Sequence, residues 1–183
     1  LSLVGSEMCI RDRLYSKWFK DNGYNVSRIP SEFKFEGRGD AFVYGDYLVG
    51  SYGIRSDKDA LLYIADQFEL EPVLAELAQE KFYHLDTCFQ NFPSGDAIFY
   101  PDAFVDKSLS TFESLFNLIP VSEHDANKLA CNAVVINNTV IFPNKDIEAV
   151  STAQNLGLQV EIADVSEFLK SGGACQCLVI ALN

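Results

Sequence analysis

Apolar and polar residues follow a pattern that recurs along most of the chain. Three times, two apolar runs flank a short turn rich in Gly, Asn, Asp or Ser, which is typical of a β-hairpin. The paired runs are 41–44 with 47–49, 88–89 with 97–100, and 133–136 with 139–142. These segments predict three hairpins.

Each hairpin is followed by a stretch with helical spacing and then by another apolar run. The predicted helices are 57–68, 107–116 and 145–156, and the strands predicted after them are 73–75, 118–121 and 158–162. The hairpin turns lie about 50 and then about 42 residues apart, a spacing typical of stacked repeats. The pattern therefore indicates units of strand, strand, helix and strand that bury their apolar faces against one another.

The segment before the first hairpin has the pattern of half a unit. Residues 14–23 predict a helix that ends at Asn22-Gly23, and residues 24–29 predict a strand. Residues 1–13 have neither helical nor strand period, and Met8 to Arg13 resemble the translation of ATG-TGT-ATA-AGA-GAC-AG, part of a sequencing-library adapter. We expect 1–13 to be an adapter-derived artefact and 14–183 to be one partial domain whose first hairpin is absent.

Composition narrows the class of protein. The 183 residues are 48% hydrophobic, which is enough for a sizeable core, and no run of 18 apolar residues predicts a membrane span. The net charge of −12 argues against a nucleic-acid partner and is compatible with a cationic substrate. Five cysteines, an odd number, and no visible signal peptide favour reduced thiols and a cytoplasmic location.

Three short segments hold the residue types of a nucleophilic site. They are Phe-Glu-Gly-Arg-Gly-Asp at 35–40, His-Leu-Asp at 84–86 and Gly-Gly-Ala-Cys-Gln-Cys at 172–177. Together they offer a thiol, an imidazole and several carboxylates, one of which is left to hold a cation. Residues 82–86 alternate like a strand, and 178–182 predict a last buried strand. Taken singly, such a cysteine is more often a buried filler, and such a histidine is more often a hydrogen-bonded core or edge residue.

In this order the segments resemble those of the guanidine-modifying superfamily, which comprises dimethylarginine dimethylaminohydrolases, arginine deiminases and amidinotransferases. The resemblance runs from about residue 14 to residue 183. It implies an α/β fold, a β/α-propeller (pentein) of ββαβ units with pseudo-fivefold symmetry, here N-terminally truncated to about three units with remnants. Arg38, inserted into the family's Glu-Gly-Gly-Asp, departs from the pattern, as does Ser56-Asp57 in place of Thr-Asn.

The resemblance also implies catalytic roles. Cys177 is the implied nucleophile, His84 the general acid and base, and Glu36 the residue that orients His84. The thiolate attacks the central carbon of a guanidinium or ureido group and forms a thiouronium intermediate, which water releases. This chemistry requires neither a metal nor an organic cofactor.

Three further residues are implied to bind substrate. Asp86 is implied to hold the guanidinium, and Arg55 is implied to pair with the α-carboxylate of a guanidino or ureido amino acid. Asp40 is implied to bind substrate as well, or to have a structural role instead.

The implied function is hydrolysis of C–N bonds in arginine-like linear amidines. Alternatives are an amidinotransferase, a non-catalytic arginine-binding homologue and, more remotely, a zinc-binding module at Cys175 and Cys177. A homo-oligomer is compatible with the pattern. Because the family takes a further guanidinium-binding carboxylate from its first unit, we expect the 183-residue polypeptide alone to be inactive.

Overall fold

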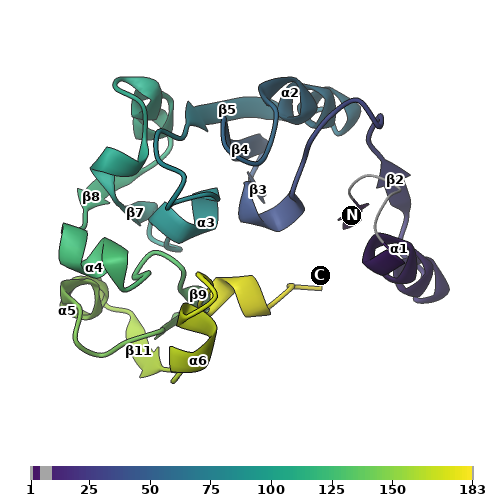
Figure 1. Ribbon diagram of the computed structural model, residues 1–183. Coiled ribbons are helices and arrows are strands. Elements are labelled where there is room, and N and C mark those ends of the chain that lie inside the picture. The colour runs from purple at the N-terminus through teal and green to yellow at the C-terminus, as the bar shows by residue number, and fades with distance from the viewer. Residues whose placement is uncertain (1, 5–9, 183) are drawn as a thin grey trace.

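The computed structural model describes residues 2–4 and 10–182, which form an arc of small sheets around a central space (Figure 1). Three sheets have three strands each, in the orders β3-β4-β5, β6-β7-β8 and β9-β10-β11. In each of these three sheets the first two strands are antiparallel and the last two are parallel. The predicted strand-strand-helix-strand repeat is therefore confirmed. The strands are Ala41–Tyr44 (β3), Tyr47–Tyr52 (β4), Glu71–Glu76 (β5), Phe89–Asn91 (β6), Asp96–Phe99 (β7), Asn117–Pro120 (β8), Val134–Ile136 (β9), Thr139–Phe142 (β10) and Gln159–Ile162 (β11).

A helical segment connects the two parallel strands of each sheet, as a parallel pair requires. In the first and third units it is the α-helix Lys58–Gln67 (α2) or Glu148–Asn155 (α5). In the second it is the 3-10 helix Ser108–Ser114 (η3) and not the predicted α-helix. Ser110, Thr111 and Ser114 each donate a side-chain hydrogen bond to the carbonyl three residues earlier, which favours the tighter turn.

None of the helices in the described ranges is long and apolar enough to cross a membrane. Short helices fill the loops between the larger elements. They are Gly37–Gly39 (η1), Leu85–Cys88 (α3), Pro101–Ala103 (η2), Glu123–Asn127 (α4), Ser166–Leu169 (α6) and Gln176–Leu178 (η4).

The N-terminal part is a strand-helix-strand piece. Ser2–Val4 (β1) pairs in parallel with Val26–Arg28 (β2), and Ile10–Asp21 (α1) connects them. Strand β1 lies where no strand period was expected, and α1 begins four residues before the predicted boundary at Leu14. Residues 5–9, with Cys9, lie outside the described residues.

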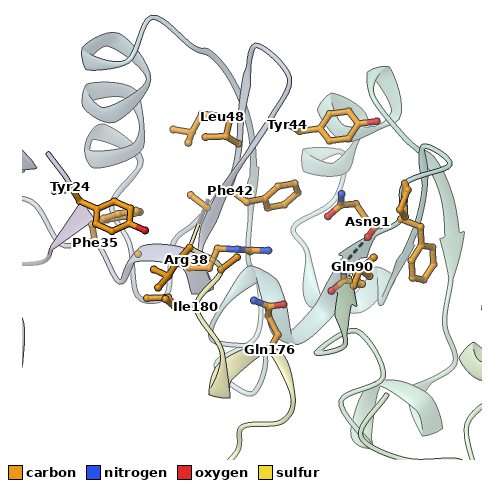
Figure 2. Close-up of a pocket in the computed structure, with 18 of the residues that line it drawn as sticks. Tyr24, Phe35, Arg38, Phe42, Tyr44, Leu48, Gln90, Asn91, Gln176 and Ile180 are labelled. Carbon is orange, nitrogen blue, oxygen red and sulfur yellow. Dashed lines mark hydrogen bonds between the residues drawn. The ribbon is translucent and has the colours of Figure 1, made fainter. Parts of the chain in front are cut away.

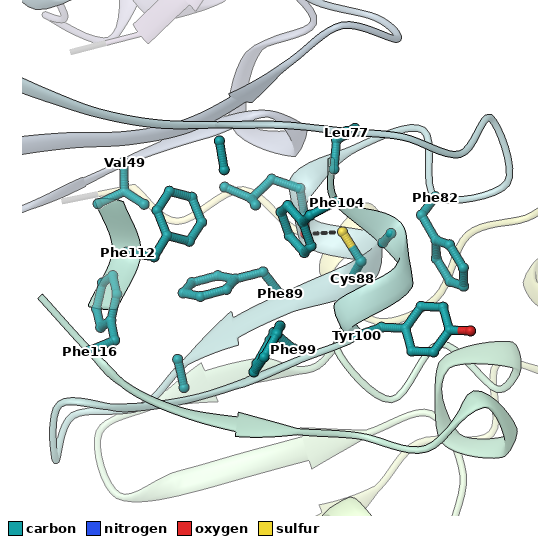
Figure 3. Packing of buried hydrophobic residues seen from close by; sticks show 14 of the residues in the cluster. Val49, Leu77, Phe82, Cys88, Phe89, Phe99, Tyr100, Phe104, Phe112 and Phe116 are labelled. Atoms are coloured by element: carbon teal, nitrogen blue, oxygen red, sulfur yellow. Dashed lines mark hydrogen bonds between the residues drawn. The ribbon is translucent and has the colours of Figure 1, made fainter. Parts of the chain in front are cut away.

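The apolar cores lie between neighbouring units, as expected for stacked repeats. The cluster between the first two full units is rich in aromatic rings (Figure 3). There Phe89 makes edge contacts with Phe112 and Phe116, at centroid distances of 5.0 and 5.4 Å. This packing fixes β6 and the preceding α3, which carries part of the candidate site.

Two predicted strands near the site are absent from the structure. Residues 82–86 are not an alternating strand, because the chain turns there and enters α3 at Leu85. Residues 178–182 are not a buried strand either: among the described residues this segment pairs with no strand, and its apolar side chains are exposed. An apolar run becomes a strand only where a neighbouring strand can hydrogen-bond to its backbone, and the sequence pattern alone does not show whether such a neighbour exists.

Candidate active site

The first part of the site is an imidazole–carboxylate pair from two loops. Nε2 of His84 lies 2.7 Å from Oε2 of Glu36, and the histidine side chain is the more buried partner. A carboxylate at this distance orients the ring. Gly39 permits this approach, because a Cβ on residue 39 would lie 2.5 Å from His84 Nδ1.

The second part is a buried carboxylate in the first turn of α3. One oxygen of Asp86, Oδ2, lies 3.9 Å from Sγ of Cys177, while Oδ1 has no hydrogen-bond partner within the described residues. Burial raises the pKa of Asp86 to about 6, and the nearby His84 and Arg38 oppose that rise. A buried acceptor without a partner is costly unless a ligand supplies the donor, and a planar cation would do so.

The third part is the thiol of Cys177, which lies in η4 after the pair Gly172-Gly173. This thiol is exposed, whereas Cys88, Cys131 and Cys175 are buried. Burial of part of the residue and the carboxylate of Asp86 raise the pKa of Cys177. A cation bound beside the sulfur would have the opposite effect and favour the thiolate.

Asn132 was missed by the sequence reasoning, although it lies at the centre of the site. Its buried amide donates to Sγ of Cys177 at 3.3 Å and to the backbone carbonyl of Asp86 at 2.9 Å. The available signal was a single amide between the apolar residues 130–131 and 133–135. A buried side chain of that kind needs partners, which here are the chain around the nucleophile.

Asp40 lies beneath the site with both carboxylate oxygens engaged. Ser51 and Ser56 donate their hydroxyls to it at 2.9 and 2.6 Å, and the backbone N–H of Leu85 donates at 3.3 Å. Burial raises the pKa of Asp40, while His84 and the two serines oppose that rise. These bonds favour the structural role for Asp40 over contact with substrate, because they tie the first hairpin to the start of α3.

Arg55 lies at the rim of the site. Its Nη1 is 3.4 Å from Oε1 of Glu36, and its guanidinium lies over the ring of Tyr83 at 5.4 Å. Both charged side chains are about half exposed to solvent, so the ion pair is weak and readily exchanged for another partner. Tyr83 in turn donates its hydroxyl to the carbonyl of Gly172 at 2.9 Å.

A cavity of about 560 Å³ adjoins the site but is not lined by its reactive side chains (Figure 2). Arg38 and Gln176 project into it, and Arg38 lies over the ring of Phe42 at 5.2 Å. A much smaller recess is lined by both Arg38 and Asp86. The cluster of titratable groups, and not this cavity, marks the candidate site, because proton transfer requires groups within hydrogen-bond reach.

The structure thus links Glu36 to His84 and Asp86 to Cys177, from three segments far apart in sequence. Such a set can supply a nucleophile, an acid-base pair and an anion for a planar cation. The described residues contain no group of three His, Cys, Asp or Glu side chains placed to hold a metal ion.

Comparisons with known proteins show the family of the chain. The family model described as N,N dimethylarginine dimethylhydrolase, eukaryotic, matches residues 16–183. The chain is 38% identical over 175 residues to the bifunctional arginine dihydrolase/ornithine cyclodeaminase AgrE of Nostoc, covering 92% of this chain and 25% of AgrE. It is 30% identical over 172 residues to N(G),N(G)-dimethylarginine dimethylaminohydrolase of Mycobacterium tuberculosis, covering 93% and 56%.

A solved structure is also similar. The N-terminal domain of cyanobacterial ArgZ, covalently bound to a reaction intermediate, superposes with a TM-score of 0.90 at 34% identity, covering 96% of this chain and 68% of that one. The expected α/β-propeller fold is therefore confirmed. This chain spans only part of the relatives that it matches.

Proposed function

Because this chain belongs to the N,N-dimethylarginine dimethylhydrolase family, we propose that the complete protein hydrolyses a C–N bond of an arginine-like guanidino or ureido amino acid. The observation that carries the proposal is the exposed Cys177 thiol beside the buried, partly unpaired carboxylate of Asp86. The names of the relatives, an arginine dihydrolase and a dimethylarginine dimethylaminohydrolase, support hydrolysis.

The first half of the reaction begins when the guanidinium docks against Asp86. Its positive charge favours the thiolate of Cys177, which attacks the central carbon and forms a carbon–sulfur bond. Protonated His84, held by Glu36, donates its proton to the departing nitrogen as the carbon–nitrogen bond breaks. The products of this half are a free amine or ammonia and a thiouronium on Cys177.

The second half uses the same residues in reverse roles. Neutral His84 removes a proton from water, whose oxygen attacks the thiouronium carbon. The carbon–sulfur bond then breaks, the electron pair returns to the Cys177 sulfur, the added hydroxyl loses its proton to solvent, and the ureido product leaves. Arg55 pairs with the α-carboxylate of the substrate, and this ion pair replaces its weak contact with Glu36.

Two alternatives use the same side chains. An amidinotransferase would replace water by an acceptor amine in the second half, and the names of the relatives favour water. A non-catalytic arginine-binding protein would not need the imidazole–carboxylate pair of His84 and Glu36, so that pair argues for chemistry.

The experiment compares two alkylating reagents of similar shape, 2-chloroacetamidine, which is a cation, and neutral 2-chloroacetamide. After correction for their reactivity with free cysteine, we expect the cation to label Cys177 about tenfold faster, equivalent to about 1.4 kcal/mol of recognition. Asp86→Asn should remove this preference, and buried Cys175, read in the same peptide by mass spectrometry, is the internal control. Equal corrected rates at Cys177 would overturn the proposal.

Turnover identifies the substrate in the complete protein. Arginine, methylated arginines and citrulline are supplied separately, and ammonia or methylamine release is measured for each. An acceptor-dependent release would favour the transferase instead.

A further inference from the structure

We infer that Asn132 is a positioning residue that holds the Cys177 sulfur beside Asp86 and donates a hydrogen bond to its thiolate. The inference rests on the proposed function only in taking Cys177 as the nucleophile. Asn132 lies in the loop before β9, 45 residues before the cysteine, and its side chain is fully buried.

Every hydrogen-bonding group of the Asn132 amide is used around the site. Its nitrogen donates to Sγ of Cys177 at 3.3 Å and to the carbonyl of Asp86 at 2.9 Å. Its oxygen accepts from the backbone N–H groups of Ala174 and Cys177, at 3.1 and 3.3 Å. The backbone carbonyl of Asn132 also accepts from the N–H of Gln176 at 3.1 Å. One amide therefore clamps the cysteine loop to the first turn of α3.

These partners determine the orientation of the amide. Two N–H groups face the Asn132 oxygen, and the carbonyl of Asp86 faces its nitrogen, so the reversed amide would set donors against donors. The nitrogen must then point at the sulfur. A donor aimed at sulfur stabilises the thiolate more than the thiol, because the anion is the stronger acceptor.

The charges around Cys177 explain why such a donor is useful before the substrate binds. Partial burial and Asp86 both raise the pKa of Cys177, and the Ala174 amide and Asn132 lower it. Tyr83 and Cys175 also interact with Cys177 and supply no positive charge. The positively charged or protonatable groups His84 and Arg38 act on Asp86. The hydrogen bond from Asn132 offsets part of the electrostatic repulsion between the Cys177 thiolate and the carboxylate of Asp86, which is proposed to bind the cation.

The test measures the rate at which iodoacetamide, a neutral reagent, alkylates Cys177 across a pH series, with the site of labelling read by mass spectrometry. Asn132→Ala removes the donor, and isosteric Asn132→Asp replaces it by an acceptor. We expect the pH midpoint to rise by roughly half a unit to one unit in the alanine variant and further in the aspartate variant. At pH 7 the rate should fall about three- to tenfold for Asn132→Ala.

A purely structural role would give a different result. Loosening of the loop would raise the rate at every pH, including labelling of Cys175, without moving the midpoint. Asn138→Ala, which removes an amide bonded to Gly157 away from the site, should leave the midpoint unchanged. If Asn132→Ala does not fold, Asn132→Asp decides alone, and a midpoint within about 0.2 unit of the parent chain in a folded variant overturns the inference. Because iodoacetamide carries no charge, this outcome is independent of the amidinium preference that tests the proposed function.

Discussion

Among single residues of the site, Asp86 lies in an environment that opposes its charge. Burial raises its pKa to about 6, whereas an aspartate in an unfolded chain titrates near 3.9. Between about pH 4 and 6 the folded state therefore binds more protons than the unfolded state, and the free energy of unfolding falls as the pH rises through that window. The loss is complete above about pH 6, where the proposed guanidinium ligand would need the carboxylate charged.

Asp86→Asn should remove this dependence. We expect the variant to be more stable than the parent chain at pH 7 by on the order of 2 kcal/mol, with the difference vanishing near pH 4. Urea unfolding followed by circular dichroism at several pH values measures it. Asp96→Asn is the control with the opposite sign, since hydrogen bonds from Ser94 and Asn117 lower the pKa of that exposed carboxyl. An Asp86→Asn variant equally stable or less stable at pH 7 would contradict the argument.

The site could be predicted from sequence only as far as its residues carry local patterns. The segments around Glu36, His84 and Cys177 each combine a reactive residue with neighbouring glycines or a second acid, and such local combinations can be recognised in the sequence. Asn132 has no such local pattern. Its importance comes from bonds to chain segments 42 to 46 residues away, which the sequence does not display.

At the scale of elements, the hairpins were predicted closely because turn residues act locally. The first hairpin was predicted at 41–44 and 47–49 and lies at Ala41–Tyr44 and Tyr47–Tyr52. The start of α3 was misjudged because its cause is distant: the carboxylate of Asp40 accepts the N–H of Leu85, 45 residues further on. Such a cap overrides the alternation of residues 82–86.

The contact between α3 and the C-terminal loop gives a prediction at this scale. Tyr83, just before α3, donates its hydroxyl to the carbonyl of Gly172 and so tethers the loop that carries both Cys175 and Cys177. Tyr83→Phe should cost about 1 kcal/mol of stability and raise the labelling rate of buried Cys175 several-fold, because the loop opens more often. Alkylation with mass spectrometry measures the rate.

Tyr63→Phe serves as the matched control for that loop. It removes a hydroxyl from α2, where the ring of Tyr63 packs near Phe33, and should leave Cys175 protected. If Cys175 is labelled equally fast in the parent chain and in Tyr83→Phe, the tether does not hold the loop closed.

At the scale of the whole molecule, the repeating units bury their apolar faces only where a neighbouring unit covers them. Clusters of buried residues fill each junction along the arc. At its two ends large apolar side chains remain exposed, and on the C-terminal tail these are Leu178, Val179, Ile180 and Leu182. The tail also forms part of the wall of the large cavity. Apolar surface of this kind is a site of association.

The 183-residue polypeptide should therefore self-associate through its tail. Ile180→Lys places a charge on a side chain that is 58% exposed, where a lysine can reach water, so it should weaken association without unfolding the chain. Light scattering after size exclusion, over a dilution series, should show the parent chain above its 20.4 kDa monomer mass and the variant closer to it. Val105→Lys, at an exposed apolar residue between η2 and η3, should leave the mass of the parent chain unchanged. Equal masses for the parent chain and for Ile180→Lys would contradict this prediction. Any association would then use another surface, and α1, with exposed Leu14, Tyr15 and Trp18, offers the next side chains for substitution to lysine.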